Sequence, residues 1–477
     1  MDFDYSLLIP EYVLVGWAFL VMGVELFFPR LRKDLVAYLA ALGALVGVGL
    51  SLGWINEDAD FGAELFHVDN YTTFFRVLLM GNAALICIAS AQFVRRRLTS
   101  AGEYYGLILL GTAGGIGMAG GTEMITAWIS LELFSFTTYI LVSYAKRDLR
   151  SNEGGLKYML LGAFSTALFL YGLSLIYGVT GTTTYAGIAE ALTGPAAELD
   201  FALLLGLVLV VTGLGFKVSA VPFHAWAPDA YEGAPLPITA YISTASKVAG
   251  FAFFLRFFVQ AFMPIHDDWK WLLATISAAT IVFGNLLALQ QHNFKRLLAY
   301  SSISQVGFLL IGIAAGTPDA SATLLFHLAG YLITNLALFI AFIAYFNVTG
   351  NDEIEGMRGL AEREPLLALV MTVALFSLAG MPIFAGFFTK MFLFQAGWNA
   401  GLQWLAALAV VGSLISLYYY LLVMKQMYMY EPTRRGRVYV PPVLTGVVAV
   451  LMVAVIGIGV YPTPLLDAAD RAGKFIF

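Results

Sequence analysis

Residues 215–251 read GFKVSAVPFHAWAPDAYEGAPLPITAYISTASKVAGF, and they set two lysines inside apolar runs on either side of a proline-containing break. Lys217 lies near the end of the first run, and Lys247 lies in the middle of the second. A charge in the middle of a membrane helix costs roughly 2.5–3.5 kcal/mol, so it persists where it faces a bundle interior, pairs with another charge or lines a water path. The stretch therefore predicts a helical membrane bundle with a polar interior.

The composition also points to a membrane protein. The chain has 477 residues, of which 60% are hydrophobic and only 12% are charged. A soluble domain carries about 25% charged residues, so this composition excludes a water-soluble globule. The net charge of −5 gives no sign of a nucleic-acid binder.

Fourteen apolar runs are long enough, at about 20 residues each, to cross a membrane as helices. They span residues 7–28, 35–54, 72–94, 104–120, 123–144, 156–178, 201–220, 236–260, 269–289, 297–315, 320–347, 366–398, 402–430 and 440–462. We therefore expect an all-α polytopic membrane protein with about 14 transmembrane helices. The expected segments are a three-helix N-terminal part (1–100), a first half with helices 4–8 (101–260), an inverted second half with helices 9–13 (261–430) and helix 14 with a tail (431–477).

The loops predict the orientation of the bundle. With the N-terminus outside, the inner loops carry sixteen Lys and Arg residues and the outer side only four. The outer side also carries an acidic loop from Glu57 to Asp69. We therefore expect both termini on the periplasmic side of the membrane or its equivalent. Asp2 and Asp4 stand where a signal peptide would be basic, so we expect no cleaved signal.

Two further charges lie deep inside apolar runs, Glu132 in the fifth run and Lys390 in the twelfth. Together with Lys217 and Lys247 they would cost on the order of 10 kcal/mol if unpaired in lipid. One acid cannot neutralise three lysines, so structural ion pairs explain only part of the set. Burial disfavours the charged form of a lysine, and a nearby carboxylate favours it. A carboxylate that moves would switch a lysine between holding and releasing a proton, which predicts a proton relay.

Two of the runs are interrupted by proline. Pro222 follows Lys217 by five residues in the seventh run, and Pro382 precedes Lys390 by eight residues in the twelfth. Proline removes a backbone hydrogen bond and kinks or breaks a helix. Broken helices in the two halves of a bundle are typical of inverted-repeat transporters, in which the site lies at the break. The pattern predicts two inverted five-helix repeats with broken helices 7 and 12.

Three residues are weaker candidates for proton transfer. His224 follows the break in the seventh run and His327 lies within the eleventh, and an unperturbed histidine changes charge near neutral pH. A lone histidine is nevertheless more often a packing residue. Lys157 opens the sixth run on the inner side, where an anchoring role competes with a relay role. Lys425 lies near the inner end of its run, so its long side chain can reach the interface.

The chain carries no visible cofactor motif. Cys87 is the single cysteine, which excludes an intrachain disulfide and a cysteine-held zinc or iron–sulfur site within the chain. The segment GIGMAG at 115–120 matches GxGxxG, but it lies inside an apolar run without the preceding strand that a dinucleotide site needs. We interpret these glycines as contacts that let membrane helices approach closely. No cofactor or metal is expected in this chain.

Several stretches, in order along the chain, resemble one known family. The stretch 215–251, with YEGAP and STASKVAGF within it, resembles the central signature of the antiporter-like subunits of respiratory complex I, and it is most similar to the subunit N type of bacterial NADH–quinone oxidoreductase (NDH-1). LELFSFTTYIL at 131–141 resembles the helix-five glutamate motif, QHNFKRLLAYSSISQVGF at 291–308 the helix-ten segment, and SLAGMPIFAGFFTK at 377–390 the broken helix twelve. Together these matches run from about residue 100 to 430.

The resemblance implies a role for each buried charge. Glu132 would pair with Lys217 and receive the coupling signal, and Lys217 would be the first base to hold a proton. Lys247 would be the connecting base, and Lys390 the terminal base that releases protons outward. Lysine rather than glutamate at 390 resembles subunit N more than subunit M. NADH, FMN, iron–sulfur clusters and quinone would be bound by other subunits, and membrane subunits of the M and K types would be neighbours.

Other functions share part of this pattern. Large subunits of multi-subunit Na⁺/H⁺ antiporters and of membrane-bound hydrogenases are similar in helices five, seven and twelve. A permease for a small solute would need a cavity lined with polar groups of the solute's size, whereas the buried groups here are mostly titratable. We therefore expect a proton-translocating subunit of an NADH–quinone oxidoreductase that holds no redox site of its own.

Overall fold

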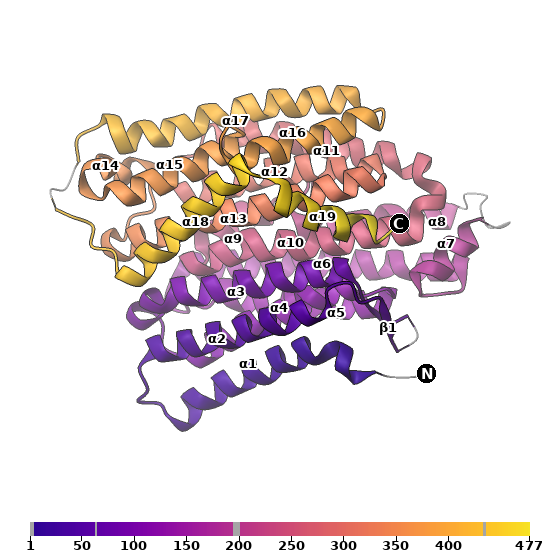
Figure 1. The fold of residues 1–477 in the computed structure, drawn as a ribbon, viewed down its shortest axis with the longest axis horizontal. Coiled ribbons are helices and arrows are strands. Elements are labelled where there is room, and N and C mark those ends of the chain that lie inside the picture. The colour runs from indigo at the N-terminus through magenta and orange to yellow at the C-terminus, as the bar shows by residue number, and fades with distance from the viewer. Residues whose placement is uncertain (1–3, 63, 194–200, 433–435) are drawn as a thin grey trace.

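The computed structural model of the chain describes residues 4–62, 64–193, 201–432 and 436–477. Nearly all of these residues are helical, and the long helices lie side by side in one bundle (Figure 1). The expected fold class, an all-α membrane protein, is confirmed. Each of the fourteen apolar runs contains helix in the structure.

Three helices open the bundle, and a short hairpin joins the last two of them. They are α1 (Ile9–Phe27), α2 (Lys33–Ser51) and α3 (Asn70–Arg97), with short 3-10 turns η1 (Tyr5–Leu8) and η2 (Leu52–Trp54). The hairpin pairs β1 (Ala59–Phe61) with β2 (Phe66–Val68) in antiparallel register, with Ala59 opposite Val68. It lies in the acidic outer loop, where no strand was expected because each strand is only three residues long.

The remaining helices follow in two groups. The first group is α4 (Ala101–Gly120), α5 (Met124–Val142), α6 (Leu149–Thr180), α7 (Tyr185–Thr193), α8 (Phe201–Val218), α9 (Trp226–Gly233) and α10 (Leu236–Phe262). The second is α11 (His266–Ala288), α12 (Phe294–Ala315), α13 (Pro318–Thr349), α14 (Leu360–Arg363), α15 (Pro365–Ala379), α16 (Ala385–Asn399), α17 (Gln403–Met429), α18 (Pro442–Val460) and α19 (Thr463–Lys474). The predicted division of the chain into four segments stays a prediction.

Within the described ranges, 11 helical stretches are long and apolar enough to cross a membrane. One of them, 236–288, joins α10 and α11, which are separate helices with the turn η4 (Met263–Ile265) between them. The glycine-rich α4 is not among the eleven, and α15 and α16 are each too short. The start of α1 and the C-terminal end of α19 lie at the same end of the bundle (Figure 1), which requires an even number of crossings. The number fourteen and the inverted repeats stay predictions.

Both helices that were predicted to be broken are interrupted. Residues 219–225 separate α8 from α9, and Ser219 has a φ of +68°. Residues 380–384 separate α15 from α16, with φ of +87° at Gly380 and +77° at Ile383. These left-handed residues turn the chain out of the helix. Because a helix end leaves carbonyl groups without helical partners, each break exposes backbone oxygens to nearby side chains.

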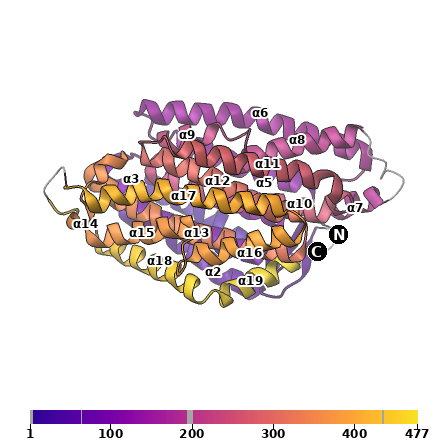
Figure 2. The same ribbon diagram turned by 90° about the horizontal axis from the view of Figure 1, so that it is seen from above.

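The helices α10, α12 and α13 form the centre of the bundle. In the apolar stretch that would cross the membrane, 94% of the residues are buried in α12 and in α13, whereas only 28% are buried in α1 and in α18. Nearly every residue of α10 is buried as well. Seen from above, α12 and α13 lie between outer helices such as α6 and α18 (Figure 2). A polar residue on a central helix is therefore kept away from lipid.

Glycines of α4 let α5 pack closely against it. A Cβ atom at Gly114 would lie 2.8 Å from the backbone nitrogen of Phe134, and one at Gly117 would lie 2.4 Å from the Ser130 hydroxyl. The GIGMAG segment is thus a helix-packing surface, as interpreted from the sequence. This close approach fixes the position of α5, which carries Glu132.

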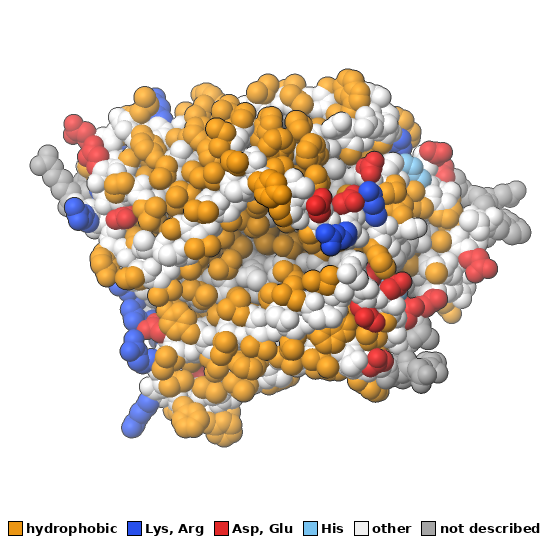
Figure 3. Space-filling model, viewed as in Figure 1, with side chains coloured by type: hydrophobic (Ala, Val, Ile, Leu, Met, Phe, Trp, Pro, Cys, Tyr) orange, Lys and Arg blue, Asp and Glu red, His pale blue; other side chains and the backbone are white. Residues whose placement is uncertain are grey.

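Most charged side chains lie toward the two ends of the bundle, apart from a group of both signs between the centre and one end, and the rest of the lateral surface is mostly hydrophobic (Figure 3). On the face shown, most Lys and Arg side chains mark one end and most Asp and Glu side chains mark the other. The arrangement fits a membrane-crossing bundle, with the polar ends in the two interfaces. Which end faces the periplasm stays a prediction.

Candidate functional site

The three lysines singled out from the sequence are all buried, on α8, α10 and α16. Lys217, Lys247 and Lys390 expose 3%, 0% and 4% of their surface. Within the described part of the chain, none of the three forms an ion pair with a carboxylate. Hydroxyl groups, backbone carbonyls and aromatic rings surround their ammonium groups instead, as the contacts of each lysine show.

Lys217 contacts α5. Its Nζ donates a hydrogen bond of 2.8 Å to Ser135 Oγ and lies 4.2 Å from the centre of the Phe134 ring, within the range of a cation–π contact. Glu132 precedes Ser135 by three residues on the same helix, yet it makes no hydrogen bond or ion pair to any described residue, and its Oε1 is buried without a partner. Lys217 therefore contacts Ser135 rather than Glu132, although the two charges still interact electrostatically. The pairing of Glu132 with Lys217 stays a prediction.

Lys247 uses the break between α8 and α9. Its Nζ donates a 2.7 Å hydrogen bond to Ser219 Oγ, and it lies 5.3 Å from the Trp226 ring and 5.9 Å from the Tyr231 ring. Ser219 stands two residues after Lys217. The left-handed turn at Ser219 brings the serine hydroxyl to Lys247. The break thereby places Lys217 and Lys247 on either side of one short turn of chain.

Lys390 uses the break between α15 and α16 in a similar way. Its Nζ donates hydrogen bonds of 2.6 Å to the Leu378 carbonyl and 3.0 Å to Ser413 Oγ. Ser413 in turn donates a 2.8 Å bond to the Ala379 carbonyl. These carbonyls belong to the last turn of α15, where the helix has no donors left for them. The Phe308 ring, 4.8 Å away, completes the site.

The three buried lysines form a row, with Lys217 and Lys247 in the first group of helices and Lys390 in the second. Three hydroxyl groups lie between the two parts of this buried row. The Tyr331 hydroxyl on α13 lies 3.0 Å from Ser302 Oγ on α12 and donates a 3.1 Å hydrogen bond to the Ser243 carbonyl on α10. The Tyr231 hydroxyl on α9 also lies 3.3 Å from Ser302 Oγ. Since the Tyr231 ring faces Lys247, these hydroxyls lead from the surroundings of Lys247 into the second half of the bundle.

A small cavity lies beside Lys390 at the other end of these hydroxyls. Tyr331, Gln305 and His327 line it together with Lys390, and its volume of about 10 Å³ is roughly the room of one water molecule. His327 Nδ1 lies 3.0 Å from Thr389 Oγ1, while its Nε2 and the Gln305 Oε1 are buried without partners among the described residues. Buried polar atoms of this kind are usually satisfied by water.

The other two weak candidates lie outside the buried row. His224 is partly buried in the segment between α8 and α9, where its Nδ1 has no partner among the described residues. Lys157 is half exposed and pairs with Glu153 at 2.7 Å and with Asp229 at 2.8 Å. The contacts of Lys157 are those of a surface ion-pair group, which matches its anchoring alternative.

Asp229 on α9 is the centre of that surface group. It accepts hydrogen bonds of 2.8 Å from Lys157 and 2.9 Å from Arg296. Burial acts to raise the pKa of the Asp229 carboxyl, but the bonds from Lys157 and Arg296 outweigh it and hold that pKa below its usual range. The group therefore ties α6, α9 and α12 together at neutral pH.

Three serines that hold the lysines were not predicted: Ser135, Ser219 and Ser413. Ser219 had a usable signal, because it follows Lys217 by two residues at the proline-containing break. Ser135 and Ser413 had none, since each meets its lysine only through the packing of separate helices. In the described ranges, no group of three His, Cys, Asp or Glu residues is placed to hold a metal ion.

Comparison with known proteins places this site in a family. The transmembrane family described as NADH:quinone oxidoreductase/Mrp antiporter matches residues 121–416, which include Glu132 and all three buried lysines. NAD(P)H-quinone oxidoreductase subunit 2 of Picosynechococcus sp. is 38% identical over 479 residues, which cover 98% of this chain and 91% of the relative.

Two solved structures are similar over nearly their whole length. A chain of respiratory complex I from Thermus thermophilus, with bound aureothin, is 29% identical with a TM-score of 0.81, covering 96% of this chain and 99% of that chain. A chain of the archaeal membrane-bound sulfane sulfur reductase is 26% identical with a TM-score of 0.85, covering 98% and 97%. The resemblance to antiporter-like subunits of complex I is confirmed, while the subunit name N is only approximate. The chain belongs to the NADH:quinone oxidoreductase/Mrp antiporter transmembrane family.

Proposed function

We propose that this chain translocates protons across a membrane through a buried relay that contains Lys217, Lys247 and Lys390. The observation that carries the proposal is the set of contacts of these lysines, which are buried with hydroxyl, carbonyl and aromatic partners but pair with no carboxylate of the described residues. A permanent positive charge in such surroundings is costly, so each lysine is suited to hold a proton for part of a cycle and release it.

Each residue has a distinct place in the proposed relay. Lys217 takes a proton first, and Lys247 receives it across the turn that holds Ser219. Protons then pass the interhelical hydroxyls and the small cavity, with His327 as a further carrier, to Lys390. Glu132 Oε1 has no hydrogen-bond partner among the described residues, so movement of this acid toward Lys217 would favour the charged lysine and movement away would favour proton release. His224 and Lys157 stay at the margin, where they hydrate or anchor the inner side.

The energy source lies elsewhere in the proposed assembly. The names of the relatives refer to NAD(P)H–quinone oxidoreductase and to respiratory complex I, and we propose that this chain serves as a membrane subunit of such a translocase. Quinone reduction would occur in other subunits, which would bind NADH, FMN, the iron–sulfur clusters and quinone. Membrane subunits of the M and K types would flank this chain in a bacterial inner membrane, with both termini on the periplasmic side.

Antiport of Na⁺ and H⁺ is the second candidate, because the family description covers Mrp antiporters as well. Both functions would use the same buried bases, so the relay geometry alone supports either one. They differ in what drives the protons: quinone reduction in one case and a sodium gradient in the other.

The experiment is Lys217→Ala, introduced into the host that assembles this chain. NADH-driven quinone reduction and the transmembrane pH difference are recorded together in inverted membrane vesicles. The matched control is Lys425→Ala, which removes a lysine that is exposed at the surface of a spanning helix. We expect both signals to fall in the first variant and to persist in the control.

Two other results would change the conclusion. If Lys217→Ala assembles normally and keeps both signals at the control level, the buried lysine is a structural residue and the relay is wrong. If quinone reduction is untouched while sodium-dependent proton exchange is lost, the chain is an antiporter subunit.

A further inference from the structure

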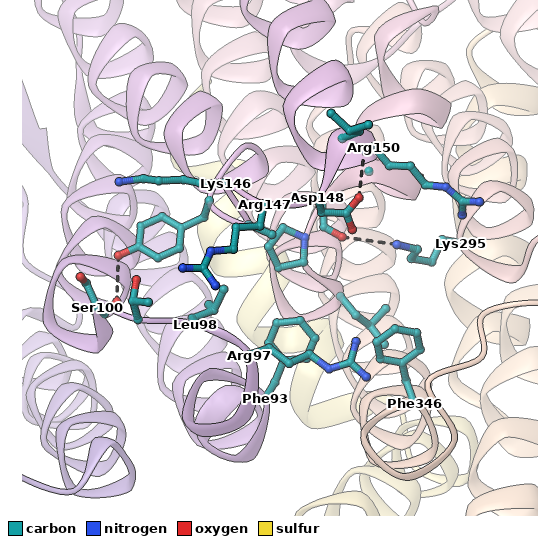
Figure 4. Close-up of a pocket in the computed structure, with 18 of the residues that line it drawn as sticks. Phe93, Arg97, Leu98, Ser100, Lys146, Arg147, Asp148, Arg150, Lys295 and Phe346 are labelled. Carbon is teal, nitrogen blue, oxygen red and sulfur yellow. Dashed lines mark hydrogen bonds between the residues drawn. The ribbon is translucent and has the colours of Figure 1, made fainter.

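A large basic cavity opens at the end of the bundle where Lys and Arg collect, away from the relay. Its volume is about 900 Å³, and it lies among the ends of α3, α4, α5, α6, α10, α12 and α13. In Figure 4, Arg97 and Arg147 point into the hollow from different elements, while Lys146 lies on one side of it and Lys295 on the other. Nothing in the relay uses this space.

The cavity carries a surplus of positive charge. Five cationic side chains line it against two carboxylates, those of Glu103 and Asp148. Asp148 already caps α6 through a 3.0 Å bond from the backbone of Arg150, and Glu103 lies 3.4 Å from the Tyr144 hydroxyl. In the described part of the chain, Arg97, Lys146 and Arg147 have no carboxylate partner. The lining is therefore complementary to an anion.

A second hollow continues the cavity along the lateral surface. It is lined by apolar side chains of α1, α4 and α5, including Met22, Leu107 and Ile140, and its volume is about 300 Å³. It shares Lys146, Tyr144 and Glu103 with the basic cavity, so the two spaces meet at these residues. Past Ile140, the exposed Phe136 and Leu133 extend the apolar surface along α5.

We propose that the two spaces together bind one anionic phospholipid. Its phosphate would lie among Lys146, Arg147 and Arg97, and an acyl chain would follow the groove past Ile140 along α5. Basic pockets between transmembrane helices on the side rich in Lys and Arg suit anionic lipid headgroups. A bound chain would cover the surface of α5 one to two turns from Glu132, which gives the membrane a direct contact with the helix that carries the relay acid.

Two features favour a lipid over a soluble phosphate or a plain interface anchor. The apolar groove begins at the basic cavity, and a soluble anion has no apolar part that would fill it. Interface anchoring alone accounts for basic residues in an inner loop. Several basic residues of this end, however, are paired with acids, as Arg95 is with Asp34 at 2.8 Å and Arg296 with Glu232 at 2.9 Å, whereas no described carboxylate pairs with Arg97, Lys146 or Arg147.

The test measures lipid binding by the purified full-length chain in detergent. Phosphatidylglycerol is titrated against it while thermal unfolding is followed by tryptophan fluorescence, since a ligand of the folded state raises Tm. Phosphatidylcholine with the same acyl chains tests the need for charge, and inorganic phosphate and glycerol phosphate test the need for a chain. The variant is the double substitution Lys146→Gln and Arg147→Gln, and the matched control is Arg30→Gln, in the loop after α1.

We expect phosphatidylglycerol to raise Tm of the wild type and of the control, and phosphatidylcholine to leave it unchanged. Each basic residue near a membrane surface contributes about 1 kcal/mol to anionic lipid binding, which is about fivefold in Kd. The double variant should therefore bind about 25-fold more weakly. If it binds as tightly as the control, these residues serve only as interface anchors and the proposal is overturned.

A second variant tests the groove without changing charge. Ile140 is 49% exposed, so Ile140→Trp fills the groove without disturbing the core. We expect it to weaken phosphatidylglycerol binding while Tm without lipid stays at the wild-type value. If inorganic phosphate or glycerol phosphate stabilises the wild type as well as the lipid does, or if Ile140→Trp has no effect, the site takes a soluble anion and the lipid proposal is wrong.

Discussion

Replacement of Ser219 by alanine tests the relay at the residue that joins its first two lysines. Ser219 accepts a 2.7 Å hydrogen bond from Lys247 Nζ in a fully buried site. A hydrogen bond to a charged group contributes about 1.5–3 kcal/mol, which corresponds to a factor of about 10 to 100. If Lys247 must carry a proton in every turnover, Ser219→Ala should lower the rate of proton translocation by at least about tenfold.

A glycine at the same position separates the lost hydroxyl from backbone strain. Ser219 has a φ of +68°, a conformation that costs a residue with a side chain about 1–2 kcal/mol and costs glycine almost nothing. Ser219→Gly should therefore raise Tm above that of Ser219→Ala, while both variants lose proton translocation to the same extent. The rate of proton translocation should therefore depend on the serine hydroxyl, and Tm should depend on the backbone conformation at this position.

The assay uses inverted vesicles from cells in which the intact assembly contains the variant chain. The initial rate of acidification is recorded with a fluorescent pH probe after NADH is added, and quinone reduction is followed in the same sample. Ser277→Ala is the matched control, because it removes a buried hydroxyl that donates to the Gly307 carbonyl and not to any of the groups that hold the three lysines. Wild-type acidification in Ser219→Ala, or recovery of acidification in Ser219→Gly, would refute the reasoning.

Three further predictions concern the second break and the surface group. Ser413→Ala removes one acceptor from the terminal lysine, and we expect acidification in the same vesicle assay to fall by about tenfold. Gly386→Ala would place a Cβ atom 1.7 Å from the Ser377 carbonyl oxygen. We expect this clash to lower the stability measured by thermal unfolding by about 1–3 kcal/mol. Gly178→Ala is the control, because its Cβ atom would meet nothing within 4 Å. Asp229→Asn should lower Tm at pH 7; because the folded-state pKa of this carboxyl is depressed, the difference from wild type should persist above the usual pKa of about 4 and vanish as the pH falls through the folded-state value.

The positions of the buried bases could be predicted because they depend on local sequence. Lysines in the middle of apolar runs must be buried in a bundle, and the nearby prolines predicted that the chain would leave the helix beside Lys217 and Lys390. Both features are present in the structure. The helical runs were predictable for the same reason, since each is a continuous local pattern.

The partners of these lysines could not be predicted from local sequence. Ser135 and Lys217 are 82 residues apart and meet only because α5 and α8 pack together. Ser135 rather than Glu132 contacts the ammonium group of Lys217, because one turn of helix decides whether position 132 or position 135 faces it. Side-chain direction at that scale depends on how helices rotate against one another, and spacing along a chain does not encode it.

The most direct measurement of the central claim compares Lys217→Ala, Lys390→Ala and the variant that carries both substitutions. Acidification of inverted vesicles is measured for each, with assembly checked in the same membranes. If the lysines act in series on one path, the double variant should be no slower than the slower single variant, because residues that act as a unit are not additive. If the losses multiply instead, the two lysines act independently, and a single buried relay is contradicted.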